Sequence, residues 1–276
     1  MKRVVISRKG FDSSTGKKPS RGSPIFDDGT IFSIPVHIDN QSPHVFKEVR
    51  YGGINAYDAI KYVFSNSRKK VYSENDVCHF DPNLSIKPGL LGQQGTGQGE
   101  LEKGDVGKGD LFLFFGWFKT YGLTRYIKNL DCHHLFGWLQ IGKIVQGTKN
   151  IKDFCEEKRI KHPHSYGLWT KNTLYVSSSH LNSRFGVLQN KGSGYFPTTH
   201  EKLVLSEMEN KRKSTWKMPT KYFSEIGESL YADNMFFVPN SSGPRKWLNP
   251  KQLSINTHVG NWQEMVLNSA EFPNIE

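Results

Sequence analysis

Leu111 to Phe118 reads LFLFFGWF, and Leu135 to Val145 reads LFGWLQIGKIV. Both stretches are rich in aromatic and branched residues, which favour β-strands, and each contains an interior glycine that indicates a bulge or a bend. Working outward, the patterns predict further strands at 4–7, 30–35, 173–177 and 203–205, and helices that begin at Asn55 and Asn261. Short strands separated by glycine turns and long loops, with few helices, predict an α+β fold around a curved sheet or barrel.

The size and composition of the chain point to one folded unit. It has 276 residues, 13% of them aromatic, which is enough to bury a sizeable core, and we expect a single domain over 1–276 because no linker or repeat interrupts it. No apolar run approaches the roughly 18–20 residues that cross a bilayer, so we expect no membrane partner. Three cysteines are too few for a disulfide framework, which favours the cytoplasm.

The charge is strongly positive. Lys and Arg number 37 against 26 Asp and Glu, a net charge of +11 with a pI near 9.4, and a surplus of this size favours a polyanionic partner such as nucleic acid. Arg8 and Lys9 follow a predicted strand, where they would hold a phosphate while Asp12 orients a cation or a sugar hydroxyl. The predicted phosphate-binding residues are Arg8, Lys9, Asp12, Lys17, Lys18 and Arg21.

The glycine-rich stretch GQQGTGQGELEKGDVGKGD at 92–110 could suggest a phosphate-binding loop. A P-loop would end in Gly-Lys-Ser or Gly-Lys-Thr, but Gly107 and Lys108 are followed by Gly109. A dinucleotide fingerprint would lead into a helix, whereas this stretch leads into the strand at Leu111. We therefore interpret it as a solvated loop and exclude both kinds of nucleotide-cofactor site.

Two short histidine motifs could hold a metal. Cys78-His79-Phe80-Asp81 and His162-Pro163-His164 each offer two ligands, and Cys132-His133-His134 adds more. None has the spacing of a zinc site or of a zinc deaminase, so we expect no metal and no other cofactor. We expect His162 and His164 instead to hydrogen-bond in a loop or to line a base pocket with Trp169, Asn172 and Tyr175.

The central strands and the whole chain each resemble a known family. The Gly-Asp turn with its strand at 109–115 and the segment at 136–144 resemble the core of PUA-like barrels (EVE, ASCH and YTH domains), which implies such a core at about 100–205. The whole chain more closely resembles the nucleotide modification associated domain 3 family, through SRKGFDSSTG (7–16), CHFDPNL (78–84), GQQGTGQGELEKGDVGKGDLFLFFGWF (92–118), HLFGWLQIG (134–142) and HPHSYGLWTKNTLYV (162–176). That resemblance implies a role beside base-modifying enzymes in phage and bacterial conflict systems.

These observations predict a nucleic-acid-binding protein, rather than an enzyme, that stacks a flipped and perhaps modified base in an aromatic pocket. DNA is the expected partner, with RNA as an alternative, together with other proteins of a modification or defence system. The predicted base-binding residues are Phe115, Trp117, Trp138, Gln140, Gln93, Gln98, Trp169, Asn172 and Tyr175. Two alternatives stay open: an enzyme that modifies or cleaves nucleic acid through Asp12, His79, Asp81 or His162, with or without a metal, and a scaffold subunit of a defence complex.

Overall fold

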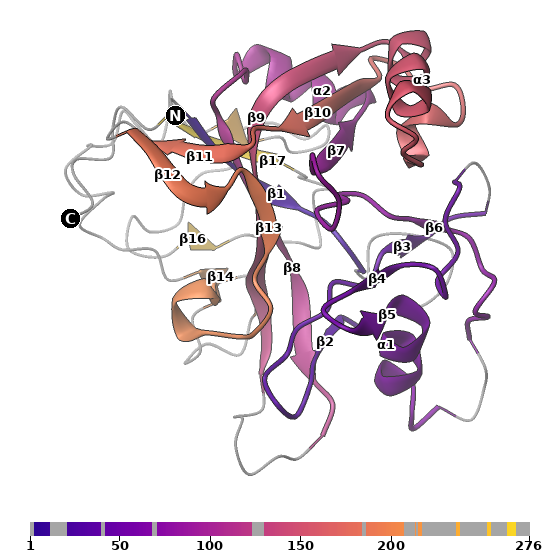
Figure 1. Cartoon of the computed structure of the whole chain (residues 1–276). Helices are drawn as coiled ribbons and strands as arrows, with labels where there is room; N and C mark the ends of the chain where they lie inside the picture. The colour runs from indigo at the N-terminus through magenta and orange to yellow at the C-terminus, as the bar shows by residue number, and fades with distance from the viewer. Residues whose placement is uncertain are drawn as a thin grey trace.

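A computed structural model of the chain describes residues 3–11, 21–39, 42–67, 71–122, 130–183, 186–206, 213, 215–216, 236–237, 253–254 and 264–268. Its two longest strands are β8 (Leu111–Thr120) and β9 (Asp131–Gln146), which run antiparallel through the middle of the molecule (Figure 1). The sequence predicted both strands, and β9 begins four residues earlier than predicted. A register shift between Phe114 and Phe115 bends the pair, as the interior glycines predicted.

The other main strands extend this pair on both sides. On one side β1 (Arg3–Arg8) lies parallel to β8, followed by β17 (Glu264–Asn268) and β15 (Phe236–Phe237). On the other side β10 (Thr173–Ser177) and β7 (Leu90–Gln93) follow β9. The strands β2 (Ser23–Ile25) and β13 (Ser193–Tyr195) pair with β8 and β9 off this path. Within the described residues the sheet is open at both ends and does not close into a barrel; the PUA-like likeness stays a prediction.

In the described part of the chain three α-helices flank the sheet: α1 (Ala56–Val63), α2 (Gly95–Lys103) and α3 (Thr148–Glu157). Two short 3-10 helices, η1 (Pro163–Ser165) and η2 (Glu201–Leu203), lie in connections. The remaining strands form two-stranded pairs: β3 (Val36–His37) with β6 (Cys78–His79), β4 (Arg50–Tyr51) with β5 (Ile54–Asn55), β11 (His180–Ser183) with β12 (Gly186–Lys191), and β14 (Thr215–Trp216) with β16 (Leu253–Ser254). None of the described helices is long and apolar enough to cross a membrane.

Separate apolar clusters hold these elements together. The largest lies between β8, β9 and α2 and includes Phe112, Phe114, Phe136 and Leu101. A second cluster packs α1 against the segments around β3 and β6, on the right of the long strands in Figure 1. A third joins α3 to β7 and β10. The segment between β6 and β7 therefore meets the segment that follows α3. They meet where the second and third clusters adjoin the sheet.

Four local predictions were wrong. The strand predicted at 30–35 is replaced by isolated bridges at Thr30 and Ile31, because the N–H groups of Ser33 and Ile34 bond the side chains of Tyr51 and Ser23 instead of a neighbouring strand. The strand predicted at 203–205 begins in the 3-10 helix η2 and keeps an isolated bridge between Val204 and His134. The helix predicted from Asn261 contains β17, which pairs with β1 and so covers backbone groups that would otherwise form an open edge. The glycine-rich stretch contains α2, because burial of Leu101 and Gln98 against the sheet outweighs the low helix propensity of glycine.

Candidate functional site: a buried histidine–aspartate cluster

Two motifs that are about eighty residues apart in the sequence meet beside β7. His79 ends β6 and Asp81 follows it, while His162 caps the 3-10 helix η1 that contains His164. The third apolar cluster, which packs α3 on β7 and β10, brings the chain after α3 back to this place. We call His79, Asp81, His162 and His164 the histidine–aspartate cluster.

The Asp81 carboxylate is the centre of this cluster. Its Oδ1 accepts a hydrogen bond from the Gly92 backbone N–H at 2.8 Å and lies 3.3 Å from His162 Nε2. Its Oδ2 lies 3.7 Å from His79 Nε2 and 4.0 Å from His164 Nε2. The side chains of Asp81 and His164 are each 3% exposed, whereas that of His79 is 24% exposed. The cluster is therefore buried and reaches solvent on the His79 side.

The orientation of His164 is fixed by a buried amide. Its Nδ1 lies 2.7 Å from Asn172 Oδ1, and the Asn172 amide nitrogen donates to the His164 carbonyl at 2.9 Å and to Thr148 Oγ1 at 3.2 Å. Because both donor bonds of the amide go to oxygens, its Oδ1 must accept the proton of His164 Nδ1. In the neutral ring the unprotonated nitrogen is then Nε2, which faces Asp81.

Electrostatics agree with a neutral His164 beside an ionised Asp81. Burial lowers the pKa of His164 to about 3, although the neighbouring Asp81 carboxylate opposes that shift. Burial alone would raise the pKa of Asp81, but contacts with His162 and His79 outweigh it and hold the pKa well below its ordinary value. The cluster is thus a carboxylate surrounded by imidazole rings.

A tryptophan forms the outer wall of the cluster. The Trp169 ring lies nearly parallel to the His164 imidazole, with centroids 5.4 Å apart and an interplanar angle of 22°. It also meets His79 edge to face at 6.4 Å. Trp169 is partly exposed, and in the same segment Tyr166 is 44% and Leu168 is 96% exposed. The segment that carries His162 and His164 therefore also presents aromatic and apolar side chains to solvent.

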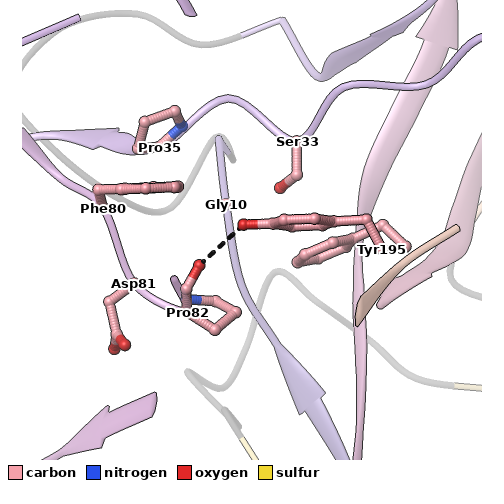
Figure 2. Close-up of a pocket in the computed structure, with 8 residues that line it drawn as sticks. Gly10, Ser33, Pro35, Phe80, Asp81, Pro82 and Tyr195 are labelled. Atoms are coloured by element: carbon pink, nitrogen blue, oxygen red, sulfur yellow. Dashed lines mark hydrogen bonds between the residues drawn. The ribbon is translucent and has the colours of Figure 1, made fainter. Parts of the chain in front are cut away.

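A small pocket lies on the other side of the turn that contains Asp81 (Figure 2). Gly10, Ser33, Phe80, Pro82 and Tyr195 line it, with Pro35, Phe136 and Asp81 completing the wall. Figure 2 shows the Tyr195 hydroxyl directed to the Pro82 carbonyl, a bond of 3.4 Å, while the Asp81 carboxylate points away from the Tyr195 ring. The cavity volume is about 10 Å³, which is room for about one water molecule and far below the roughly 300–1,000 Å³ of typical ligand pockets. In this conformation the pocket has no room for a base.

The predicted aromatic pocket on β8 and β9 is not assembled in one place. Trp138 lies opposite Leu113, whereas Trp117 lies opposite His133, four residues further along β8, or roughly 13 Å at the rise of a strand. Phe115 is fully buried. The partly exposed Trp138 packs on Phe196 and donates to a backbone carbonyl, and Trp117 donates to Asp131 at 2.7 Å.

Most of the predicted base-reading amides are occupied within the fold. Gln140 bonds the backbone of Gly109 and Asn182, and Gln98 accepts from the buried Tyr175 hydroxyl at 3.0 Å. Gln93 is 4% exposed in β7. Asn172 and Trp169 are the two members of the predicted set that lie at the histidine–aspartate cluster. Trp169 is partly exposed, so a base could contact it without unfolding a strand, whereas Asn172 is buried and its amide is engaged by His164 and Thr148.

Of the predicted phosphate-binding residues that the structure describes, Arg8 and Lys9 lie next to a residue of the small pocket and Arg21 lies over the Phe64 ring. Arg8 ends β1 and Lys9 donates its backbone N–H to the Phe115 carbonyl at 2.9 Å, and both side chains are half-buried. They lead into Gly10, which lines the pocket. Arg21 is exposed, with its guanidinium 5.0 Å from the centre of the Phe64 ring. Asp12, Lys17 and Lys18 lie outside the described residues.

Sequence reasoning missed the meeting of the two histidine motifs and a second basic stretch. Nothing in the spacing of either motif shows that 78–81 and 162–164 converge. Their donor atoms, one each from His79, Asp81 and His164, lie within 4.8 Å of one another and could hold a metal ion. The exposed Arg159 and Lys161 stand directly before His162.

Comparison with family models confirms the resemblance that the ordered motifs predicted. A family model described as nucleotide modification associated domain 3 matches residues 3–268, a range that includes both halves of the cluster. No curated protein and no solved structure matches the chain.

Proposed function

The chain belongs to the nucleotide modification associated domain 3 family, and from this premise we propose that it binds a nucleic-acid strand and holds one base against Trp169 at the histidine–aspartate cluster. The family description ties the chain to nucleotide modification. The strand itself, the base and the place of contact are what we propose. DNA is the substrate class that we favour, acting together with the enzymes of a modification system.

The observation that carries this proposal is the stacked pair of Trp169 and His164. Trp169 is partly exposed, its neighbours Tyr166 and Leu168 face solvent, and the ring beneath it is held rigidly by Asn172. A base that stacks on an aromatic side chain gains roughly 1–3 kcal/mol. The cost of leaving a helical stack is of similar size, so one ordered ring with charge-assisted phosphate contacts could offset it.

The charge around this segment supports a polyanion. Arg159 and Lys161 precede His162 and are exposed, and Lys171 follows Trp169 on the surface. Lys171 is engaged by Glu102 at 2.9 Å, which leaves Arg159 and Lys161 as the better candidates for phosphate contacts. The excess of +11 over the whole chain adds a long-range attraction.

Binding of matched oligonucleotides to two tryptophan variants tests the proposal. Trp169→Ala should weaken binding of a single strand about 5- to 150-fold, which is the fold-change of 1–3 kcal/mol. The same strand with an abasic site should bind both forms equally. Trp138→Ala is the matched control, because Trp138 is also a partly exposed indole but lies on the sheet.

The result also separates the alternatives. Loss of base-dependent binding in Trp138→Ala alone would place the base on β8 and β9, as the sequence predicted. Equal losses for intact and abasic strands would remove stacking from the mechanism. An absence of saturable binding to DNA and to RNA would overturn the proposal and favour a scaffold role.

An enzyme is a second candidate, which the cluster itself favours. An ionised carboxylate that contacts three imidazoles is an arrangement suited to proton transfer. Incubation with plain and base-modified oligonucleotides, followed by mass spectrometry, detects turnover. A product that forms with the normal chain and not with Asp81→Asn would favour the enzyme over the reader.

A further inference from the structure

We propose that His79, Asp81 and His164 bind a divalent first-row transition metal ion, and that His162 positions the Asp81 carboxylate from behind. The proposal goes beyond nucleic-acid binding and needs no nucleic acid for its test. It rests on the positions of four nitrogen atoms around the two oxygens of Asp81. Oδ1 accepts the Gly92 N–H at 2.8 Å, whereas the imidazole nitrogens of His79 and His164 lie 3.7 and 4.0 Å from Oδ2, too far for a normal hydrogen bond.

The first step concerns Oδ1 of Asp81. This oxygen accepts from the Gly92 N–H at 2.8 Å. His162 Nδ1 accepts from the His164 backbone N–H at 3.3 Å, so the proton of the neutral His162 ring is on Nε2, 3.3 Å from the same oxygen. The His162 side chain is fully buried, and its Nε2 has no aligned hydrogen-bond partner among the described residues. A metal that draws the carboxylate into place would let this proton bond Oδ1.

The second step concerns Oδ2, which faces an unprotonated nitrogen. Asn172 holds the proton of His164 on Nδ1, so the lone pair of Nε2 is directed at a carboxylate oxygen 4.0 Å away. Two acceptors that face one another in a buried site repel, and 4.0 Å is too long for a shared proton. A cation between them converts this repulsion into two bonds. The arrangement of a carbonyl that orients a metal-binding imidazole through its other N–H is general among metalloproteins.

The third step is the size of the gap. The three donor atoms lie within 4.8 Å of one another. In a tetrahedral site with bonds of about 2.0–2.1 Å, donor atoms are about 3.3 Å apart. Small rotations of the side chains close this difference. His79 is the most exposed of the three at 24%, and its movement costs the least packing.

The fourth step is the class of metal. Two imidazoles and one carboxylate suit zinc or iron(II), which accept this set and keep further positions open for water or substrate. Magnesium and calcium prefer oxygen ligands and fit the set poorly. The open positions would lie on the His79 side, next to Trp169.

Metal titration of the full chain tests the proposal. The protein is stripped with a chelator and titrated by calorimetry with Zn²⁺ or, without oxygen, with Fe²⁺, while Co²⁺ reports the geometry by visible absorption. We expect one ion per chain, and a loss of affinity of about a hundredfold or more in His79→Ala. Mg²⁺ should not compete. The choice between Zn²⁺ and Fe²⁺ follows from their relative affinities and from the metal present after purification.

Controls separate ligand loss from unfolding. His180→Ala removes an exposed histidine whose ring bonds only Ser179 among the described residues, and it should bind metal normally. Asp81→Asn keeps the shape of the buried side chain and should lose the ion. The proposal is overturned if the normal chain binds no stoichiometric ion, or if His79→Ala binds as tightly while circular dichroism shows an unchanged fold. Trp169→Ala should retain the ion, so failure of nucleic-acid binding and failure of metal binding are distinguishable.

Discussion

Gly92 lies flat against the imidazole of His164: a β-carbon built on Gly92 would approach the ring to 2.2 Å at Cδ2 and 2.6 Å at Nε2. No real β-carbon makes so close a contact, so any larger residue at this position must displace the ring. The same glycine donates its N–H to Asp81. Gly92 of β7 therefore fixes the positions of both the Asp81 carboxylate and the His164 imidazole.

Gly92→Ala should therefore weaken metal binding at least tenfold, although the substitution keeps the N–H that bonds Asp81. The shifted ring should also lower the free energy of unfolding by about 1–3 kcal/mol. Calorimetric metal titration and urea unfolding measure the two effects. Gly99→Ala is the control: its β-carbon would meet only Lys171 Nζ at 3.4 Å within helix α2, so stability should rise by about 0.5–1 kcal/mol. Equal metal affinity in both variants would contradict the role of Gly92.

Asn172 provides a test of the His164 tautomer. Asn172→Leu removes the acceptor for Nδ1–H and leaves the His164 carbonyl without its donor, which should cost about 1–3 kcal/mol of stability. Asn172→Asp loses the donor bonds but keeps an acceptor oxygen. Nitrogen-15 NMR of the imidazole at neutral pH should show the proton on Nδ1 in the normal chain and in Asn172→Asp, and a mixture in Asn172→Leu. A proton on Nε2 in the normal chain would refute the orientation that we assign to the ring.

The sheet could be predicted from sequence because the aromatic and branched residues that favour its central strands are adjacent in the chain. LFLFFGWF and LFGWLQIGKIV became β8 and β9, and the strand predicted at 173–177 is β10. Asn55 caps α1 as predicted, by accepting from the Asp58 N–H at 2.8 Å. Each of these features depends on residues close together in the chain.

The site could not be predicted in the same way, because it depends on distant segments. His79 and His164 are brought together by the packing of α3 on β7 and β10, and neither motif contains that information. Likewise α2 forms in a glycine-rich stretch because Leu101 and Gln98 are buried against the sheet, where Tyr175, far along the chain, bonds Gln98. The sequence alone does not separate ligand-binding from core aromatic residues on β8 and β9 for a related reason: the pattern that makes a strand rich in rings also makes a core.

Salt dependence should identify the residues that contact phosphate. Lys161→Ala and Arg159→Ala should each reduce the slope of log K against log salt by about one, because each removes one neutralised phosphate. Lys149→Ala removes the same charge from the surface of α3, where Lys149 pairs with Asp153 at 3.0 Å, and should leave the slope unchanged. Fluorescence anisotropy of a labelled strand at several salt concentrations measures the slopes. An equal change of slope in all three variants would mean that binding depends only on the net charge of the protein.

Stability below neutral pH should depend on His134, which is buried between β8 and the chain near Thr199. Burial lowers the pKa of this ring from 6.5 to about 4. The unfolded chain therefore takes up a proton near pH 6.5 that the folded chain refuses until near pH 4, so stability is present above pH 6.5 and falls as the pH decreases. Between pH 7.5 and pH 5 this ring should account for about 2 kcal/mol of lost stability.

Replacing the ring isolates that contribution from those of the other histidines. His134→Gln cannot titrate in this range and keeps a side chain that can bond Thr199. The free energy of unfolding of the normal chain, relative to that of His134→Gln, should therefore fall by about 2 kcal/mol from pH 7.5 to pH 5. Urea unfolding at half-unit pH steps gives this difference directly. If the two stability curves run parallel across the range, His134 takes up its proton equally in both states, and its burial does not control the acid sensitivity of the fold.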